Sequence, residues 1–277
     1  MDTISTLVES YRHDLEEAAE DLRHRGEALS QSAPKMIEDT KSQIEPQTQE
    51  LISAVQDTSA ASPAEKPIIE IFAWSTVMVL FANIGIFIGV YLVGPLVSVF
   101  LGRFGAAVIA FAGIPIYAHN SIKSSSGSDK AVRMEILAYA ILQGVITGYV
   151  IDSIYLSYIP FAIVTPAIVA LSFAAVTKTA NGDRKQLLGG TIGAAVLVNF
   201  ILGLLTGSLS FVYFLLTLTY AGIAAVVMQV AIKNLKGGGK VHVYQNALSC
   251  GLIVAKGMFF LLFGSYQPDD TDQQKSK

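Results

Sequence analysis

The sequence predicts an all-α, polytopic membrane protein with six spans plus a semi-polar C-terminal helix, seven helices in all, and a helical N-terminal extension. Hydrophobic residues make up 52% of the 277 positions, charged residues only 15%, and the mean hydropathy is +0.51. This composition is too apolar for an ordinary soluble domain. The apolar residues also gather into seven stretches, each near the roughly 20 residues that a helix needs to cross a bilayer.

Residues 1–66 form an acidic extension that carries 14 acidic and 6 basic side chains. Apolar residues between positions 4 and 29 recur at helical spacing, and Pro34 and Pro46 then divide the segment before a further helix expected over Thr48–Val55. Because the apolar stripe is thin and interrupted, we interpret the extension as loosely attached and cytoplasmic rather than as an oligomerising coil. Protein partners of residues 1–66 remain a second interpretation.

The seven apolar stretches lie within residues 67–264, which we expect to form one transmembrane bundle, followed by a short acidic polar tail over 265–277. The last stretch holds several polar residues, so it is counted apart as a semi-polar helix that either spans the bilayer or re-enters it. The predicted stretches are Phe72–Val93, Val97–Ala118, Ile136–Ser153, Tyr158–Thr177, Leu187–Leu205, Leu209–Ile232 and Val243–Phe263.

Basic residues occur in the connections after the second, fourth and sixth stretches. The connections after the first, third and fifth stretches carry essentially none. By the positive-inside rule, the basic connections and the N-terminus face the cytoplasm. The N-terminus shows no basic region followed by an apolar core, so we expect the first span to direct insertion into the endoplasmic reticulum or another secretory-pathway membrane. The basic residues of these connections are Lys123, Lys130, Arg133, Lys178, Arg184, Lys185, Lys233, Lys236 and Lys240.

Small residues four positions apart occur inside the stretches and predict close helix–helix packing. Packing is a more economical interpretation of such pairs than ligand binding. The pairs are Gly85 and Gly89, Gly144 and Gly148, and Gly189 and Gly193.

The last stretch has a polar stripe made of Gln245, Asn246, Ser249, Cys250 and Lys256. A charge placed within a span favours the bundle interior or water, so this stripe is the candidate pore lining. Hydrogen bonding between helices explains the same pattern equally well.

Two further polar residues lie within or beside the spans. Gln229 is a candidate pore position near the end of the sixth stretch, although a satisfied interfacial residue is the simpler interpretation. Arg103 is expected to reach the headgroups, with pairing to Glu135 or Asp152 as the alternative.

Enzyme chemistry has no visible machinery in this sequence. There is no Ser/His/Asp arrangement, no HExxH motif and no Cys/His cluster, and the run from Lys236 to Lys240 lacks the spacing of a phosphate-binding loop. We therefore expect no enzyme activity, no catalytic residue, no cofactor, no bound metal site and no nucleic-acid partner. The expected partners are the lipid bilayer, calcium or another cation, and proteins.

Three stretches resemble the Bax inhibitor (transmembrane Bax-inhibitor-motif) family over residues 67–264. They are Arg133–Gly148 (RMEILAYAILQGVITG), Leu187–Gly193 (LLGGTIG) and the polar final helix ending near Lys256. The resemblance implies an endoplasmic-reticulum protein that modulates cell death and intracellular calcium homeostasis. It also implies an intramembrane aspartate pair, whose positions here hold Gln229 and Cys250, so that any calcium leak would be weakened or altered.

Two alternative functions remain open at this point. One is an ion channel or transporter lined by the polar final helix. The other is a non-conducting membrane scaffold that acts through the N-terminal extension.

Overall fold

The structure, a computed structural model, describes residues 48–49, 51–60 and 65–266. The chain divides into two units, Met1–Ser53 and Ala54–Lys277. Residues 48, 49 and 51–56 are helical, close to the helix predicted over Thr48–Val55. The helical period predicted over residues 4–29 and most of the acidic tail lie outside the described residues.

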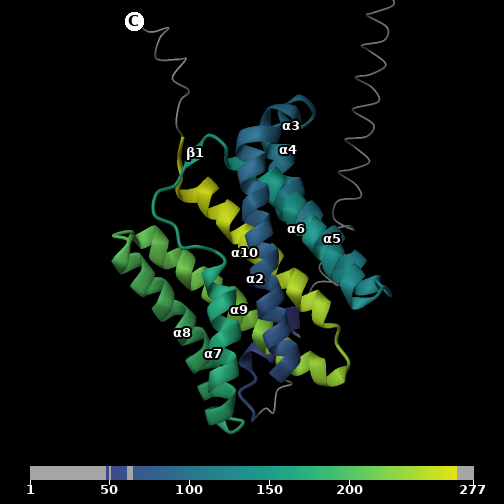
Figure 1. The fold of residues 1–277 in the computed structure, drawn as a ribbon, viewed down its shortest axis with the longest axis vertical. Coiled ribbons are helices and arrows are strands. Elements are labelled where there is room, and N and C mark those ends of the chain that lie inside the picture. Colours follow the sequence, from purple (N-terminus) through teal and green to yellow (C-terminus); the bar gives the residue numbers. More distant parts are fainter. Residues whose placement is uncertain (1–47, 50, 61–64, 267–277) are drawn as a thin grey trace, which may run out of the picture. The chain divides into compact units, whose positions relative to one another are not determined.

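The second unit is a bundle of helices with one pair of very short strands (Figure 1). Two π-helical turns, η1 and η2, interrupt long helical runs, and a 3₁₀ turn, η3, ends another. The elements are α2 (Glu65–Ile88), η1 (Gly89–Val93), α3 (Gly94–Phe100), α4 (Arg103–Val108), η2 (Ile109–Gly113), α5 (Ile114–Ser124), α6 (Asp129–Ile151), β1 (Ile154–Tyr155), α7 (Val164–Ala180), α8 (Arg184–Leu205), α9 (Phe211–Asn234), η3 (Leu235–Gly237), α10 (Val241–Phe263) and β2 (Ser265–Tyr266).

Six helical runs in the described part are long and apolar enough to cross a membrane: Glu65–Val93, Arg103–Ser124, Asp129–Ile151, Arg184–Leu205, Phe211–Gly237 and Val241–Phe263. The sequence analysis set the final helix apart from the spans, but in the structure the helix that falls short of a span is a different one. The final helix meets the length and composition of a span. The short helix is α7, whose 17 residues extend about 26 Å.

The apolar stretch predicted to start at Tyr158 becomes helical only at Val164 because its first residues form a connection. Tyr158 has a positive φ of 58°, which no helix accommodates, and Pro160 follows in non-helical backbone. Hydropathy alone does not distinguish such an apolar connection from the beginning of a span.

The second predicted span also begins later than expected, at Arg103 instead of Val97. Leu101 and Gly102 are extended and separate α3 from α4, and Tyr149 Oη donates a hydrogen bond of 2.9 Å to Leu101 O. Arg103 pairs with Asp152 at 2.8 Å, whereas the sequence analysis favoured a reach to the headgroups. The alternative pairing is the one the structure shows.

Side-chain caps explain where three helices begin. Ser128 accepts a hydrogen bond from Ala131 N before α6, Asp183 accepts from Lys185 N before α8, and Ser210 accepts from Tyr213 N before α9. Each side chain satisfies an amide that the first turn of the helix leaves free.

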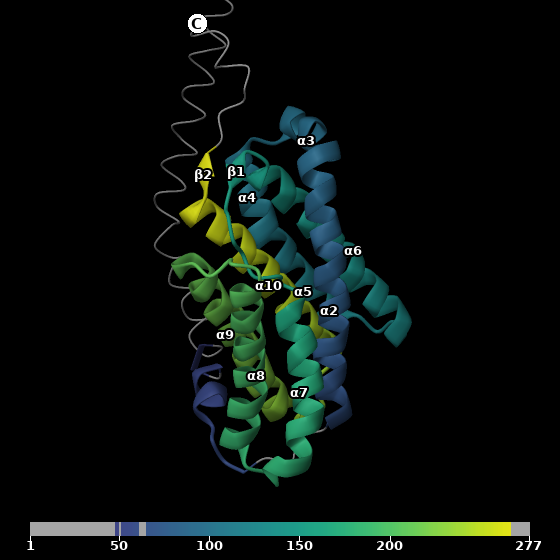
Figure 2. The ribbon, with the colours of Figure 1, turned by 60° about the vertical axis from the view of Figure 1, so that its left-hand side comes forward.

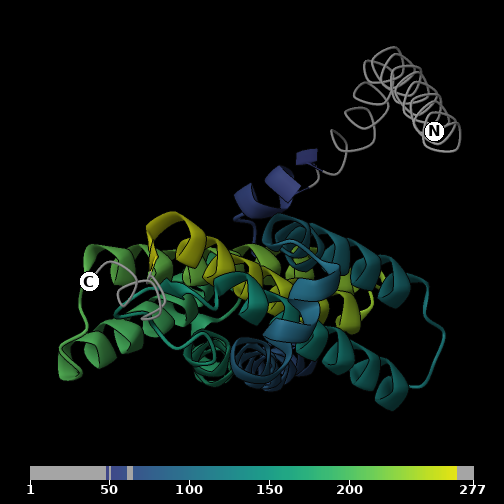
Figure 3. The ribbon, with the colours of Figure 1, turned by 90° about the horizontal axis from the view of Figure 1, so that it is seen from above.

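Helix α10 runs through the middle of the bundle and contacts α2, α5, α6 and α9. Helices α7, α8 and α9 lie side by side (Figure 2), and α2 packs against both α6 and α7. Figure 3 shows α2 and α7 nearly end-on and adjacent. The largest apolar cluster is shared by α2, α7, α8, α9 and α10, with Phe72, Phe173 and Tyr220 fully buried in it.

The glycine pairs of α2 and α6 lie where these two helices touch. A Cβ added to Gly85 would lie 2.6 Å from Ile141 O, and one added to Gly89, Gly144 or Gly148 would overlap main-chain atoms of the facing helix. The third pair behaves differently. Gly189 and Gly193 on α8 are exposed, and nothing lies within 4 Å of a Cβ at either position, so they form no packing interface within this unit.

Candidate functional site

The three basic connections lie at the same end of the bundle. The α5–α6, α7–α8 and α9–α10 connections are all toward the lower part of Figure 1, whereas α3 and β1 lie toward the upper part. This end, which we call the basic end, contains the two most elaborate polar clusters in the described part of the chain.

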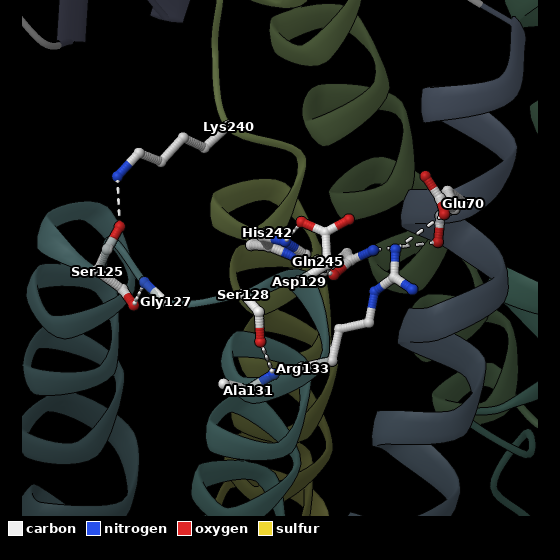
Figure 4. Close-up of polar contacts among 10 residues, drawn as sticks. All are labelled: Glu70, Ser125, Gly127, Ser128, Asp129, Ala131, Arg133, Lys240, His242 and Gln245. Carbon is white, nitrogen blue, oxygen red and sulfur yellow. Dashed lines mark hydrogen bonds and ion pairs between the residues drawn. The ribbon is translucent and has the colours of Figure 1, made fainter.

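The first cluster lines a pocket of about 510 Å³ between the start of α2, the α5–α6 connection and the start of α10 (Figure 4). A cavity of this size falls within the roughly 300–1,000 Å³ typical of ligand sites. Its ionisable lining comprises two carboxylates and three basic groups: Glu70, Asp129, Arg133, Lys240 and His242.

Arg133 and Glu70 form the side of the pocket next to α2. Arg133 Nη2 donates to Glu70 Oε1 at 2.8 Å, and its guanidinium lies 4.8 Å from the ring centroid of Trp74. Arg133 Nε is buried and has no hydrogen-bond partner among the described residues. The guanidinium is therefore held in place, and its buried Nε donor is still unused.

His242 bridges α6 and α10 at the floor of the cluster. Its Nε2 lies 3.1 Å from Asp129 Oδ1, and its Nδ1 lies 3.1 Å from Gln245 Oε1. Gln245 Nε2 in turn donates to Glu70 O at 3.4 Å, which sets the orientation of the amide. Both imidazole nitrogens of His242 therefore lie within hydrogen-bond distance of a side-chain oxygen, one on α6 and one on α10.

Lys240 joins two of the basic connections. Its Nζ donates to Lys123 O at 2.9 Å and to Ser125 O at 2.7 Å, at the end of α5. The ammonium thus satisfies carbonyls that the helix terminus leaves without partners, and it keeps a positive charge at the rim of the pocket.

The second cluster surrounds Arg184 at the start of α8. Its Nε donates to Gln229 Oε1 at 2.6 Å, its Nη2 donates to Gln229 O at 3.2 Å, and its Nη1 lies 2.6 Å from Asp57 Oδ2. Gln229 Nε2 donates to Val55 O at 3.1 Å. Arg184 is only 2% exposed, so each polar atom of its guanidinium is directed to a protein acceptor.

Hydrogen bonds from Ser59 Oγ and Ser59 N, followed by the charge of Arg184, lower the pKa of Asp57 to about 2. The carboxylate is therefore ionised throughout the physiological range. It provides the countercharge for a guanidinium that would otherwise be buried without one.

The predicted polar stripe of α10 is mostly buried. Ser249 Oγ donates to Gln245 O at 2.8 Å, Cys250 Sγ donates to Asn246 Oδ1 at 3.6 Å, and Ser75 Oγ of α2 donates to Gln245 O at 3.2 Å. Lys256 Nζ donates to Asn83 Oδ1, again on α2. The stripe thus bonds within α10 and across to α2.

The structure brings together residues that the sequence analysis had not grouped. Gln229 joins Arg184 and Asp57, and Gln245 joins His242 and Glu70, whereas Asn246, Ser249, Cys250 and Lys256 lie deeper along α10. The only available signal was the density of ionisable residues at the predicted span ends. Within the described residues, no group of three or more His, Cys, Asp and Glu side chains could hold a metal ion.

Comparison with known protein families gives a match to a family model described as Interactor of ZYG-11, which covers residues 1–266. No curated protein and no solved structure matches the chain significantly. The resemblance to the Bax inhibitor family is therefore wrong, and the roles in cell death and calcium homeostasis that it implied are withdrawn with it. Hydrophobic stretches with small residues are common to unrelated helical bundles, which explains the error. Since the match spans nearly the whole sequence, this chain belongs to the Interactor of ZYG-11 family.

Proposed function

We propose that the chain is a polytopic membrane protein whose basic end faces the cytoplasm and binds a protein partner, and that it acts by binding rather than by catalysis. The family match carries the partner-binding part of this proposal, because the family is described by its interaction with ZYG-11. The proposed partner is accordingly a ZYG-11 protein. The proposed location is the endoplasmic reticulum or another secretory-pathway membrane.

Membrane insertion is supported by both the length and the surface of the helices. Six runs have the length and hydropathy of spans, and large apolar side chains more than half exposed occur along them, including Phe87, Leu92, Leu205 and Leu262. Soluble monomers rarely expose contiguous apolar surface on this scale. Lipid chains would cover these side chains.

The basic end is the proposed docking surface because the positive-inside rule places it in the cytoplasm. Lys178 and Lys185 flank the α7–α8 connection, and Lys236 is exposed between α9 and α10. These ammonium groups are available to acidic side chains of a partner, and charge complementarity of this kind mainly speeds association and selects the partner.

Insertion and orientation are tested by cysteine labelling. In a Cys250→Ala background, Ser126→Cys in the α5–α6 connection and Thr206→Cys after α8 receive a membrane-impermeant maleimide in sealed microsomes. We expect Ser126→Cys to react in intact vesicles and Thr206→Cys only after permeabilisation. Reaction of both sites without permeabilisation contradicts the proposed topology.

Partner binding is tested with the full-length chain in detergent and purified ZYG-11. We expect a complex by size-exclusion chromatography, weakened by the triple variant Lys178→Gln, Lys185→Gln, Lys236→Gln. The matched control, Thr206→Gln with Tyr155→Gln at the opposite end, should bind as the parent does. No complex with the folded parent chain, or equal weakening by both sets, contradicts the proposal.

A further inference from the structure

We propose that the pocket bounded by Glu70, Asp129, Arg133 and Lys240 binds the phosphoethanolamine headgroup of a membrane lipid. This inference rests on the proposed membrane insertion. It goes beyond partner binding, since it assigns a small-molecule site to the basic end of the bundle.

The position of the pocket fits a headgroup. Its lining residues come from the N-terminal parts of α2, α6 and α10, from the last turn of α5 and from the α5–α6 connection. Four helices that meet the criteria for spans thus begin or end around it, which places it at the boundary between hydrocarbon and water. Basic pockets between helices at this depth on the cytoplasmic side are a known chemical solution for headgroup binding.

The mixed charge of the pocket selects a zwitterion (Figure 4). Arg133 is suited to a phosphate and retains a buried Nε donor without a partner among the described residues, whereas Lys240, whose Nζ donates to Lys123 O and Ser125 O, adds positive charge at the rim. Glu70 and Asp129 would repel a purely anionic ligand but accept hydrogen bonds from an ammonium group. In phosphoethanolamine two carbons separate the phosphate ester from the ammonium group, so the headgroup matches both the basic and the acidic side chains of the pocket.

A primary ammonium fits the two carboxylates better than a choline group does. Ethanolamine offers three N–H donors, whereas trimethylammonium offers none. The carboxylates of Glu70 and Asp129 lie on different helices, α2 and α6, and so can approach the ammonium from two directions. The pocket therefore discriminates between lipids that differ only by three methyl groups.

An apolar recess beside the pocket provides room for the rest of the lipid. It measures about 350 Å³ and is lined by Ile69, Ala73 and Trp74 together with Glu65, Lys66 and Glu70. Glu70 lines both cavities, and Arg133 lies over the Trp74 ring between them. Tryptophan at this level is typical of the interface between headgroups and chains.

The test uses the full chain in nanodiscs of phosphatidylcholine doped with phosphatidylethanolamine or with phosphatidylglycerol. Emission from Trp74, the chain's one tryptophan, reports occupancy of the pocket. We expect phosphatidylethanolamine to bind about tenfold more tightly than either other lipid, the effect of one or two charge-assisted hydrogen bonds. A preference for phosphatidylglycerol, or no preference among the three, overturns the proposal.

Two variants at exposed positions test the site, and the melting temperature of each is measured to confirm that the bundle remains folded. Asp129→Asn should abolish the discrimination between ethanolamine and choline, and Lys240→Gln should weaken binding of both. The matched controls Lys130→Gln and Lys236→Gln, which lie on the same end but outside the pocket lining, should bind as the parent does. Equal effects of variants and controls overturn the assignment of the site.

Two soluble probes separate a lipid from a free ligand. Phosphoethanolamine and inorganic phosphate are titrated against the chain in phosphatidylcholine nanodiscs. We expect both to bind far more weakly than the lipid, because neither fills the apolar recess. Equal affinity for soluble phosphoethanolamine overturns the lipid assignment. Cysteine labelling that shows correct insertion, combined with no lipid preference, rejects this inference while leaving the proposed function intact.

Discussion

Asp57 Oδ2 lies 2.6 Å from Arg184 Nη1 and connects a segment that precedes the first span to the start of α8. The pair is asymmetric, because the arginine side chain is 2% exposed and the aspartate 31%. The guanidinium is buried mainly by Gln229 of α9, and the carboxylate closes the cluster from the outside. Three parts of the chain that are distant in sequence thus meet at one arginine.

Arg184→Ala should destabilise the folded protein by about 1–3 kcal/mol, because Gln229 Oε1 and Gln229 O each lose a donor in a buried site. The melting temperature in detergent measures the effect. The control is Lys185→Ala, at an exposed position one residue further along the same helix. It should change the melting temperature little. Equal melting temperatures for the two variants would contradict the role assigned to Arg184.

Asp57 should contribute to stability in a pH-dependent way. Its pKa is lowered from 3.8 to about 2, so the contribution is fully present above pH 3.8 and is lost as the pH falls through about 2. The melting temperature of Asp57→Asn should therefore lie below that of the parent by a constant amount between about pH 7 and pH 5, and the gap should narrow below about pH 4.

Ser59→Ala provides the internal check on this pH dependence. The hydrogen bond from the Ser59 hydroxyl contributes most to lowering the Asp57 pKa. Its removal should therefore raise that pKa, so that the gap in melting temperature narrows at a higher pH. A gap that widens as the pH falls would show that the ionised form of Asp57 does not stabilise the fold.

Glycine at the α2–α6 interface is required by space. Gly144→Val should destabilise the bundle by about 1–3 kcal/mol or prevent its assembly, because its Cβ would overlap main-chain atoms of Ala82 that cannot move independently. Gly193→Val on α8, where nothing lies within 4 Å of the added Cβ, is the matched control. Thermal unfolding in detergent distinguishes them, and comparable losses would contradict the close approach of the two helices.

Hydropathy located most of the long apolar helices because the requirement for about 20 apolar residues is local. It misplaced the start of α7, since the segment from Tyr158 to Ile163 is apolar as a whole but forms a connection. It also could not reveal that Gly189 and Gly193 face outward, because spacing alone does not say which helix face meets another.

The candidate sites were less predictable than the fold because they are built from residues far apart in sequence. Asp57, Arg184 and Gln229 come from three segments, and no periodicity links them. The sequence gathers ionisable residues at the span ends but does not state which of them pair. The resemblance led to the wrong family because it was based on general features of helical spans, which unrelated bundles share.

Lys256 and Asn83 provide the final prediction, which separates a structural polar contact from an essential charge. Lys256 Nζ donates to Asn83 Oδ1, and Asn83 Nδ2 donates to Val79 O at 2.7 Å. Lys256→Met removes the charge and keeps the length of the side chain, so the helix packing should survive. Asn83→Leu leaves an ammonium without its acceptor inside the bundle, which should cost about 1–3 kcal/mol.

The two variants therefore give opposite results under the two possible roles of this contact. If the contact only satisfies a buried lysine, the melting temperature falls for Asn83→Leu and changes little for Lys256→Met, and the double variant recovers most of the loss. Ser126→Ala, at an exposed position in the α5–α6 connection, controls for general effects of substitution. If the melting temperature falls more for Lys256→Met than for Asn83→Leu, the ammonium itself stabilises the fold through interactions beyond Asn83.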